Sequence, residues 1–299
     1  MELRQLKTFL AVCEELHFTK AAEKLGISQP TLSLQIKTME DELQVPLFDR
    51  VGKKIVLTQA GLLLREHARQ LVRQLDNTMD AIAELRDHRR GLLNVGVLPS
   101  DLDYRMPDLL VDFHSEFPRI QLKIISTVEI VQKVLGNEVD IGIGLMTFPD
   151  NRLVRIPLCR EEYVLVVSEN HPLAERRTIA YEELREVDTV MFPIGYIGRD
   201  LVEESCLRHG FALRTIMETS SVTPLIRLVE SNIGATIQPY PLIRSMNRKG
   251  LRCIRIAEDP PIRSLELMHR SDRFLGQAAN TFIRKVVDYF REQPGKPDA

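Results

Sequence analysis

Residues 18–54 have a pattern of apolar and polar positions that predicts two short helices joined by a tight turn. In the first segment Thr19 is a suitable N-cap, and Gly26 permits the sharp turn that ends the segment. Its apolar residues share one helical face: Ala21, Ala22 and Leu25. This layout is typical of a helix-turn-helix unit.

The second predicted helix begins after Ser28, a good N-cap, with Pro30 in its first turn, where the missing N–H costs nothing. One face is apolar at spacings of four, three and four residues: Leu32, Ile36, Met39 and Leu43. The opposite face is polar, and such short polar side chains can reach base edges in the major groove. Basic residues around Val51 and Gly52 then predict a β-wing that contacts phosphate or the minor groove. The candidate DNA-binding residues are Gln29, Pro30, Thr31, Ser33, Gln35, Lys37, Arg50, Lys53 and Lys54.

An alternative for this region is a helical hairpin with a solvated polar face. Net charge does not separate the two, because residues 1–58 hold eight Lys/Arg and eight Asp/Glu. Any electrostatic attraction to DNA is therefore expected to be local.

Residues 58–89 predict one long helix, with Thr58 as its cap and Gly91 after its end. Apolar and small positions alternate four and three residues apart: Leu64, Ala68, Leu71, Leu75, Thr78, Ile82 and Leu85. Such a narrow seam between charged flanks favours a two-stranded dimer interface over packing against the chain's own domain. A dimer would place two recognition helices on a pseudo-palindromic site.

After Gly91, short apolar runs alternate with helical patterns, which is typical of a parallel sheet covered by helices. Strands are expected at residues 92–98, 121–126 and 140–144, and the chain is expected to enter a second lobe around residues 161–167. An apolar strand at residues 264–269 is then expected to bring the chain back to the first lobe. A final amphipathic helix completes that lobe and contains Phe282, Val286, Tyr289 and Phe290.

The N-terminal motifs resemble those of the LysR-type transcriptional regulators. The matching residues are Leu6 to Phe9, Phe18-Thr-Lys-Ala-Ala, Leu25, Ser28-Gln-Pro-Thr-Leu-Ser, Ile36, Glu40, Leu47-Phe-Asp-Arg50 and Leu57-Thr-Gln-Ala-Gly61; farther along, Asp140-Ile-Gly-Ile, Pro157-Leu and His171-Pro-Leu173 also fit the family. One position departs: Leu34 stands where the family often has arginine. We therefore expect the base or phosphate contact made there to be missing and the operator preference to differ.

The resemblance implies an all-α winged helix-turn-helix domain and a long linker helix, joined to an α/β two-lobed effector domain like a periplasmic binding protein. The corresponding ranges are residues 1–58, 59–90 and 91–299, with lobe I at 91–162 and 267–299 and lobe II at 163–266. It also implies a regulator that binds promoter DNA, pairs its dimers into tetramers, and works with RNA polymerase. A small-molecule effector would lie between the lobes.

Positions after strand ends select the candidate effector contacts, because ligands of such sheets lie beyond the carboxyl ends of strands and against helix N-termini. They are Ser100, Ser126, Thr127, Met146, Phe192, Ile194, Tyr196, Thr219, Ser220 and Pro239. Ser and Thr at these positions are also ordinary helix caps. Since helix N-termini dominate the expected site, an anionic metabolite is favoured.

Composition excludes several classes of protein. No apolar run approaches the ~18 residues of a membrane span, and the start of the sequence has no signal-peptide pattern, so we expect a cytoplasmic protein. No P-loop, GxSxG, GxGxxG or metal-ligand spacing occurs, so neither enzyme activity nor a metal or other cofactor is expected.

Of four dispersed cysteines, only Cys206 lies where redox-sensing relatives carry a pair. The alternative to a regulator with a small-molecule effector is a regulator controlled by redox state or by a protein partner.

Overall fold

The computed structural model describes residues 1–51, 54–86, 91–145 and 149–292. The chain forms two compact units, Met1–Ala83 and Glu84–Ala299, and each is described by itself. Among the helices of the described residues, none combines the length and the apolar character needed to cross a membrane.

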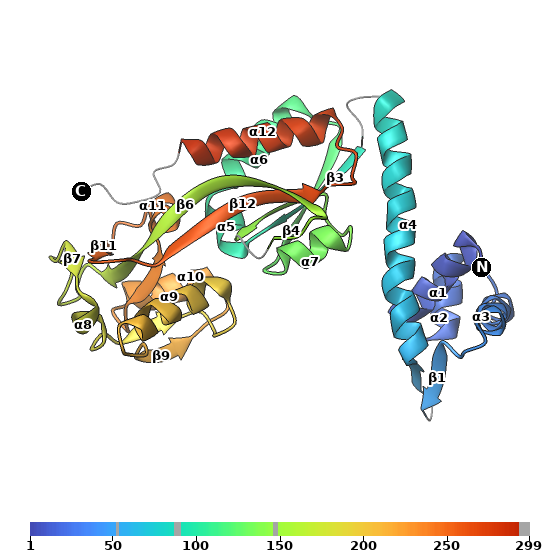
Figure 1. The fold of residues 1–299 in the computed structure, drawn as a ribbon, viewed down its shortest axis with the longest axis horizontal. Helices are drawn as coiled ribbons and strands as arrows, with labels where there is room; N and C mark the ends of the chain where they lie inside the picture. The colour runs from blue at the N-terminus through green and yellow to red at the C-terminus, as the bar shows by residue number, and fades with distance from the viewer. Residues whose placement is uncertain (52–53, 87–90, 146–148, 293–299) are drawn as a thin grey trace. The chain divides into compact units, whose positions relative to one another are not determined.

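The first unit contains three helices, a hairpin and most of a long helix (Figure 1): α1 (Leu3–Glu15), α2 (Phe18–Leu25), α3 (Gln29–Leu43), β1 (Phe48–Val51), β2 (Lys54–Leu57) and α4 (Gln59–Arg86). The hairpin is antiparallel and closes at Val51 and Lys54. The core is built from one face of each of the three short helices, including Phe9, Ala21, Leu32 and Met39.

Local chemistry explains where these helices begin and end. Gly26 ends α2 with φ 65°, a left-handed conformation that glycine adopts without strain. The Ser28 hydroxyl accepts a hydrogen bond from the Thr31 amide at 3.3 Å, and Pro30 lies in the first turn of α3, as expected. The Thr58 hydroxyl likewise caps α4 through the Gly61 amide at 3.0 Å. The expectation for Thr19 was wrong, because α2 begins at Phe18, two residues earlier than a cap at Thr19 requires, and takes the extended His17 as its N-cap.

The heptad seam of α4 divides into two parts. Leu64 and Ala68 pack into the core of the first unit, so the expectation of a dimer contact is wrong for them. Farther along, Leu71 is 57% exposed, and Leu75 and Ile82 are exposed as well. A repeat of apolar residues shows that a helix packs against another surface, but it does not show which surface. In α4 the first part of the repeat packs against the chain's own core, and the later part is exposed. The end of the predicted helix, at residues 87–90, lies outside the described residues.

The second unit is organised around a large curved sheet, whose strand order is β4-β3-β5-β12-β6-β11-β7, with β10 also paired to β6. The strands are β3 (Gly91–Val97), β4 (Ile120–Ser126), β5 (Ile141–Leu145), β6 (Leu153–Ser168), β7 (Thr178–Ile179), β10 (Thr236–Pro239), β11 (Leu251–Ile256) and β12 (Ile262–Arg270). A separate parallel pair consists of β8 (Thr189–Met191) and β9 (Thr215–Glu218). The central strand β5, Ile-Gly-Ile-Gly-Leu, is buried on both faces, as is typical of strands covered on both sides.

Two lobes share this sheet, and the helices separate accordingly. Lobe I carries α5 (Pro99–Tyr104), α6 (Pro107–Glu116), α7 (Ile130–Leu135) and α12 (Gln277–Arg291); lobe II carries α8 (Tyr181–Leu184), α9 (Ile197–Arg208), α10 (Val222–Glu230) and α11 (Tyr240–Ser245). Lobe I has one buried core, and lobe II has two, one on each side of its strands.

The strands β6 and β12 run together between the lobes (Figure 1). The first part of β6 pairs with β12, and its last part, from Tyr163 on, pairs with β10 and β11. The crossing into lobe II thus occurs within residues 161–167, as expected. Since β12 already pairs with β6 at Ile262, the return crossing precedes the predicted boundary at residue 266.

Candidate functional site: an exposed helix and an interlobe cavity

The helix α3 presents most of the predicted DNA-binding residues on its surface. Gln29, Pro30, Thr31 and Lys37 are exposed, whereas Ser33 and Gln35 are half-buried. The Gln29 side-chain amide donates to the Ser33 hydroxyl at 2.8 Å, which joins two side chains one turn apart on the helix. The side chains of Arg50, Lys53 and Lys54 lie outside the described residues.

Gln35 is oriented differently from the other members of that set. Its side-chain amide contacts the hydroxyl of buried Thr8, on α1, at 2.6 Å. The same hydroxyl donates to the Arg4 carbonyl at 3.0 Å. Gln35 therefore ties α3 to α1 in this structure, and only part of its amide remains available to another molecule.

A cavity of about 930 Å³ lies between the two lobes of the second unit and is lined from both of them. Six predicted effector contacts line it: Ser100, Ser126, Phe192, Tyr196, Ser220 and Pro239. The rings of Phe192 and Tyr196 are stacked, with centroids 5.7 Å apart, and form one apolar wall. Met146 lies outside the described residues.

Three further predicted contacts are not among the residues that line the cavity. The Thr127 hydroxyl is used in a local turn, where it accepts from the Glu129 amide at 3.1 Å. The Thr219 hydroxyl forms a similar turn with the Ser221 amide. Ile194 points to solvent and is 73% exposed. Local turns and solvent exposure explain why proximity to a strand end did not bring these side chains to the cavity.

Tyr163 is the most informative lining residue that sequence reasoning missed. It is only 3% exposed, and no hydrogen bond joins its hydroxyl to another described residue. The hydroxyl lies against the first turn of α9, only 2.8 Å from where a Cβ on Gly198 would stand. Burial raises the pKa of Tyr163 to about 12, so the hydroxyl keeps its proton and can donate it to a ligand.

Next to Tyr163, the first turn of α9 brings Gly198 and Arg199 to the cavity. The N-cap residue, Tyr196, provides no side-chain hydrogen bond to this helix end. Arg199 is 3% exposed; its Nη2 donates to Thr215 at 2.8 Å and contacts Glu203. Its Nε and Nη1 have no hydrogen-bond partner among the described residues. The N–H groups of this helix end and of the Arg199 guanidinium, whose charge Glu203 balances, therefore lie at this end of the cavity.

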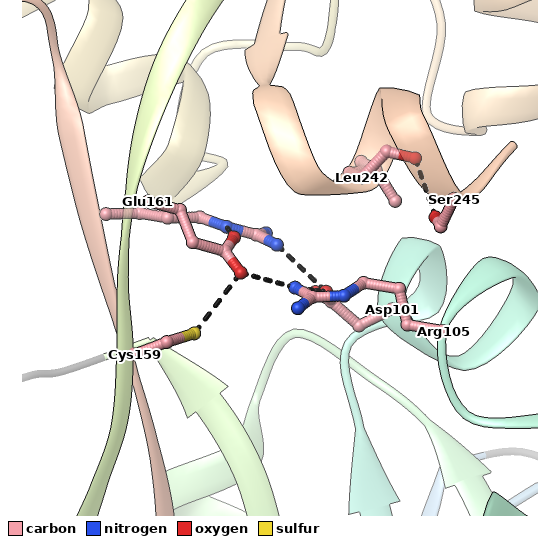
Figure 2. A network of polar contacts seen from close by, with 7 residues as sticks. Asp101, Arg105, Cys159, Glu161, Leu242 and Ser245 are labelled. Atoms are coloured by element: carbon pink, nitrogen blue, oxygen red, sulfur yellow. Dashed lines mark hydrogen bonds and ion pairs between the residues drawn. The ribbon is translucent and has the colours of Figure 1, made fainter. Parts of the chain in front are cut away.

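Arg263, on β12, also lines the cavity. It belongs to a buried ionic network whose other members, Asp101, Arg105 and Glu161, are labelled in Figure 2. Its Nε donates to Glu161 at 2.7 Å, and its Nη2 donates to Asp101 at 2.8 Å. Arg105 donates to the same two carboxylates, and its guanidinium carbon lies 4.5 Å from the centre of the Phe290 ring. All four charged residues are buried. The network thus joins α5, β6, β12 and α12 next to the cavity.

The charges in this network stabilise one another. Burial alone would raise the pKa of Glu161, but the guanidinium groups of Arg263 and Arg105 outweigh it and hold this pKa below its usual value. The thiol of Cys159 contacts the same carboxylate at 3.2 Å, and burial raises the pKa of that thiol to about 12.

The four cysteines are free thiols. Cys206, on α9, is fully buried, and burial raises its pKa to about 12, which disfavours the reactive thiolate. Within the described ranges, no group of three or more His, Cys, Asp or Glu side chains is arranged to hold a metal ion.

A helix-turn-helix unit with an exposed polar recognition helix, combined with a two-lobed domain around a cavity, defines a DNA-binding transcriptional regulator. Residues 3–62 match the family model described as bacterial regulatory helix-turn-helix protein, lysR family, and residues 86–291 match the LysR substrate binding domain. The chain therefore belongs to the LysR family of transcriptional regulators, and its second unit has the family's effector-domain fold.

Known proteins similar to this chain include regulators with and without an assigned signal. The uncharacterised HTH-type transcriptional regulator YbhD of Escherichia coli is 28% identical over 97% of this chain and 92% of its own length. The hydrogen peroxide-inducible genes activator of Pectobacterium carotovorum is 29% identical over 98% of this chain and 96% of its own. Full-length CbnR in complex with its target DNA has the same fold, with a TM-score of 0.71 and 22% identity over 97% of this chain and 99% of that one.

Proposed function

We propose that this LysR-type regulator binds a pseudo-palindromic promoter site as a homo-oligomer built from dimers, and that a small anionic effector in the interlobe cavity controls it. The observation that carries the proposal is the cavity itself, lined from both lobes and supplied with polar groups that have no hydrogen-bond partner in the described part of the chain. An effector acts by binding one arrangement of the lobes better than another, and this difference changes the affinity for the promoter or the bend of its DNA.

The proposed oligomer is supported by the exposed part of α4. Leu71, Leu75, Met79 and Ile82 are all exposed and follow one another at spacings of four, four and three residues. A contiguous apolar stripe of this kind is costly in water and suits a second copy of the same helix. Dimers that pair into a tetramer, and RNA polymerase as the partner that receives the signal, complete the proposed assembly. A protein that acts on promoters and RNA polymerase would work in the cytoplasm.

An anionic effector is supported by the chemistry at one end of the cavity. The first turn of α9, the Tyr163 hydroxyl and the Nε and Nη1 groups of Arg199 can all donate hydrogen bonds to a negatively charged ligand. Ser100 and Ser126 can supply further hydrogen bonds from lobe I. Stacked Phe192 and Tyr196 suit an apolar body between polar ends.

A thermal-shift screen of the full-length protein against carboxylates, amino acids, phosphates and aromatic acids tests the effector. We expect saturable stabilisation that grows as RT ln(1 + [L]/Kd), together with a changed affinity for a duplex selected from random DNA. A ligand that stabilises the protein but leaves DNA binding unchanged would contradict its role as an effector.

The second candidate is a regulator controlled by redox state or by a protein partner, with no small-molecule effector. The similarity to a hydrogen peroxide-inducible genes activator favours a test of the redox form. Burial of Cys206 argues against it, since peroxide reacts with accessible thiolates. A peroxide response of DNA binding that Cys206→Ser abolishes would establish the redox form. We further propose that the chain acts by binding alone; turnover by the purified protein would contradict this.

A further inference from the structure

Leu34 lies on the exposed face of α3 and is 65% exposed. The apolar face of the same helix is buried through Leu32, Ile36 and Met39. At 3.6 residues per turn, a position two residues from both Leu32 and Ile36 lies on the opposite side of the helix. Leu34 thus occupies the second turn of the recognition helix, between the exposed residues of its first turn and Lys37.

The side chains on either side of Leu34 extend this apolar surface. The Thr38 hydroxyl donates to the Leu34 carbonyl at 2.9 Å, and the Thr31 hydroxyl is paired with that of Ser28 at 2.7 Å. Both hydroxyls are engaged by the helix itself, and the methyl groups of Thr31 and Thr38 add apolar surface beside Leu34. We call Thr31, Leu34 and Thr38 the α3 apolar strip; all three are exposed.

The occupant that fits this strip follows from what the major groove offers. Base edges there carry hydrogen-bond donors and acceptors, and the one apolar group among them is the C5 methyl of thymine. A leucine can make neither a hydrogen bond to a base nor an ionic contact to phosphate, but it can cover a methyl group and exclude water from it.

We propose that Leu34 is a specificity-determining residue that reads the C5 methyl group of one thymine in each half-site. The inference rests on the proposed binding of promoter DNA through α3. Recognition of bases by hydrogen bonds alone would give Leu34 no role, whereas contact with a thymine methyl group gives it one. A protein partner on the strip is the competing occupant, and it predicts no dependence on any thymine methyl.

The test uses the full-length protein and a duplex that it selects from random DNA. Each thymine of that duplex is replaced singly by deoxyuridine, which pairs identically but lacks the methyl group, and affinity is measured by competition. At one thymine in each half-site we expect the replacement to weaken binding about fourfold, the equivalent of one buried carbon at ~0.8 kcal/mol. In Leu34→Ala this methyl dependence should disappear, while Leu34→Met, which keeps an apolar side chain of similar reach, should retain it.

Leu43→Ala is the matched control, because Leu43 belongs to the same helix but lies on its apolar side near the C-terminal end. This variant should keep the methyl dependence of the unaltered protein. If no thymine replacement weakens binding, or if the same thymine is still read by Leu34→Ala, Leu34 does not read a methyl group. If selection enriches no duplex at all, promoter recognition itself fails, and that result differs from both of the others.

Discussion

Replacing Glu161 with glutamine tests whether the ionic network beside the cavity holds the second unit together. The substitution keeps the shape of the side chain but leaves Arg105 and Arg263 with Asp101 as their remaining carboxylate in the network. All these groups are buried, so water cannot replace the missing charge. Breaking a buried ionic pair typically costs 3–5 kcal/mol, and we expect Glu161→Gln to lower the free energy of unfolding by roughly that amount.

The assay is unfolding in urea followed by tyrosine fluorescence. The chain has no tryptophan, and all six tyrosines lie in the second unit, so this signal reports that unit in the full-length protein. Asp112→Asn is the control, because it removes a carboxylate from a solvent-exposed ion pair with Lys285 and should cost less than about 1 kcal/mol. A loss for Glu161→Gln no larger than that of the control would refute the reasoning, since it would mean that solvent reaches the network.

The dependence of protein stability on acid pH should also report on the Glu161 carboxylate. The guanidinium groups hold the pKa of Glu161 in the folded protein below its usual value of 4.5. A carboxylate whose pKa is lower in the folded than in the unfolded protein stabilises the fold at pH values above 4.5, where it is charged in both states. This contribution is lost as the pH falls from 4.5 towards the folded-state pKa, because the carboxylate then has to be protonated. The unaltered protein should therefore lose stability more steeply with acid below pH 4.5 than Glu161→Gln; equal slopes would contradict the assignment.

Further substitutions test the other parts of the site. Gln29→Ala should weaken binding to the selected duplex by about 1–3 kcal/mol in competition assays, and an equal loss on random DNA would contradict base reading. Leu71→Asp should convert the dimer to a monomer in sedimentation and reduce promoter affinity with it; a monomer that still binds tightly would contradict the proposed α4 interface. Tyr163→Phe removes a hydroxyl that bonds to no other described residue, so stability should change by less than about 0.5 kcal/mol, while affinity for the effector found by screening should fall about tenfold in titration calorimetry. Unchanged affinity would exclude Tyr163 as a ligand contact.

Local signals made the helix-turn-helix unit and the first three strands of the second unit predictable from the sequence. Ser28, Pro30 and Gly26 act through backbone geometry within a few residues, and they behave as expected. Interactions between distant residues did not follow from such signals. Gln35 has the spacing of an exposed position, yet its contact is Thr8, 27 residues earlier in the chain.

The cavity shows the same division between local and long-range information. Strand ends are visible in the sequence, and Ser100 and Ser126 were reached that way. Tyr163 and Arg263 were missed because they lie within strands, where the apolar pattern gives no indication of a ligand-facing position. The buried ionic network could not be inferred either, because Asp101 and Arg263 are 162 residues apart in the sequence and come together only through the tertiary structure.

The long strands β6 and β12 have a mechanical consequence for any signal that starts in the cavity. β6 continues from lobe I into lobe II without a loop, and β12 pairs with it as far as Glu162, next to the crossing. Glu161 and Arg263 face each other across this pair of strands, so twisting it also works against their ion pair. A ligand that changes the arrangement of the lobes therefore has to act on a continuous strand and on its buried ion pair.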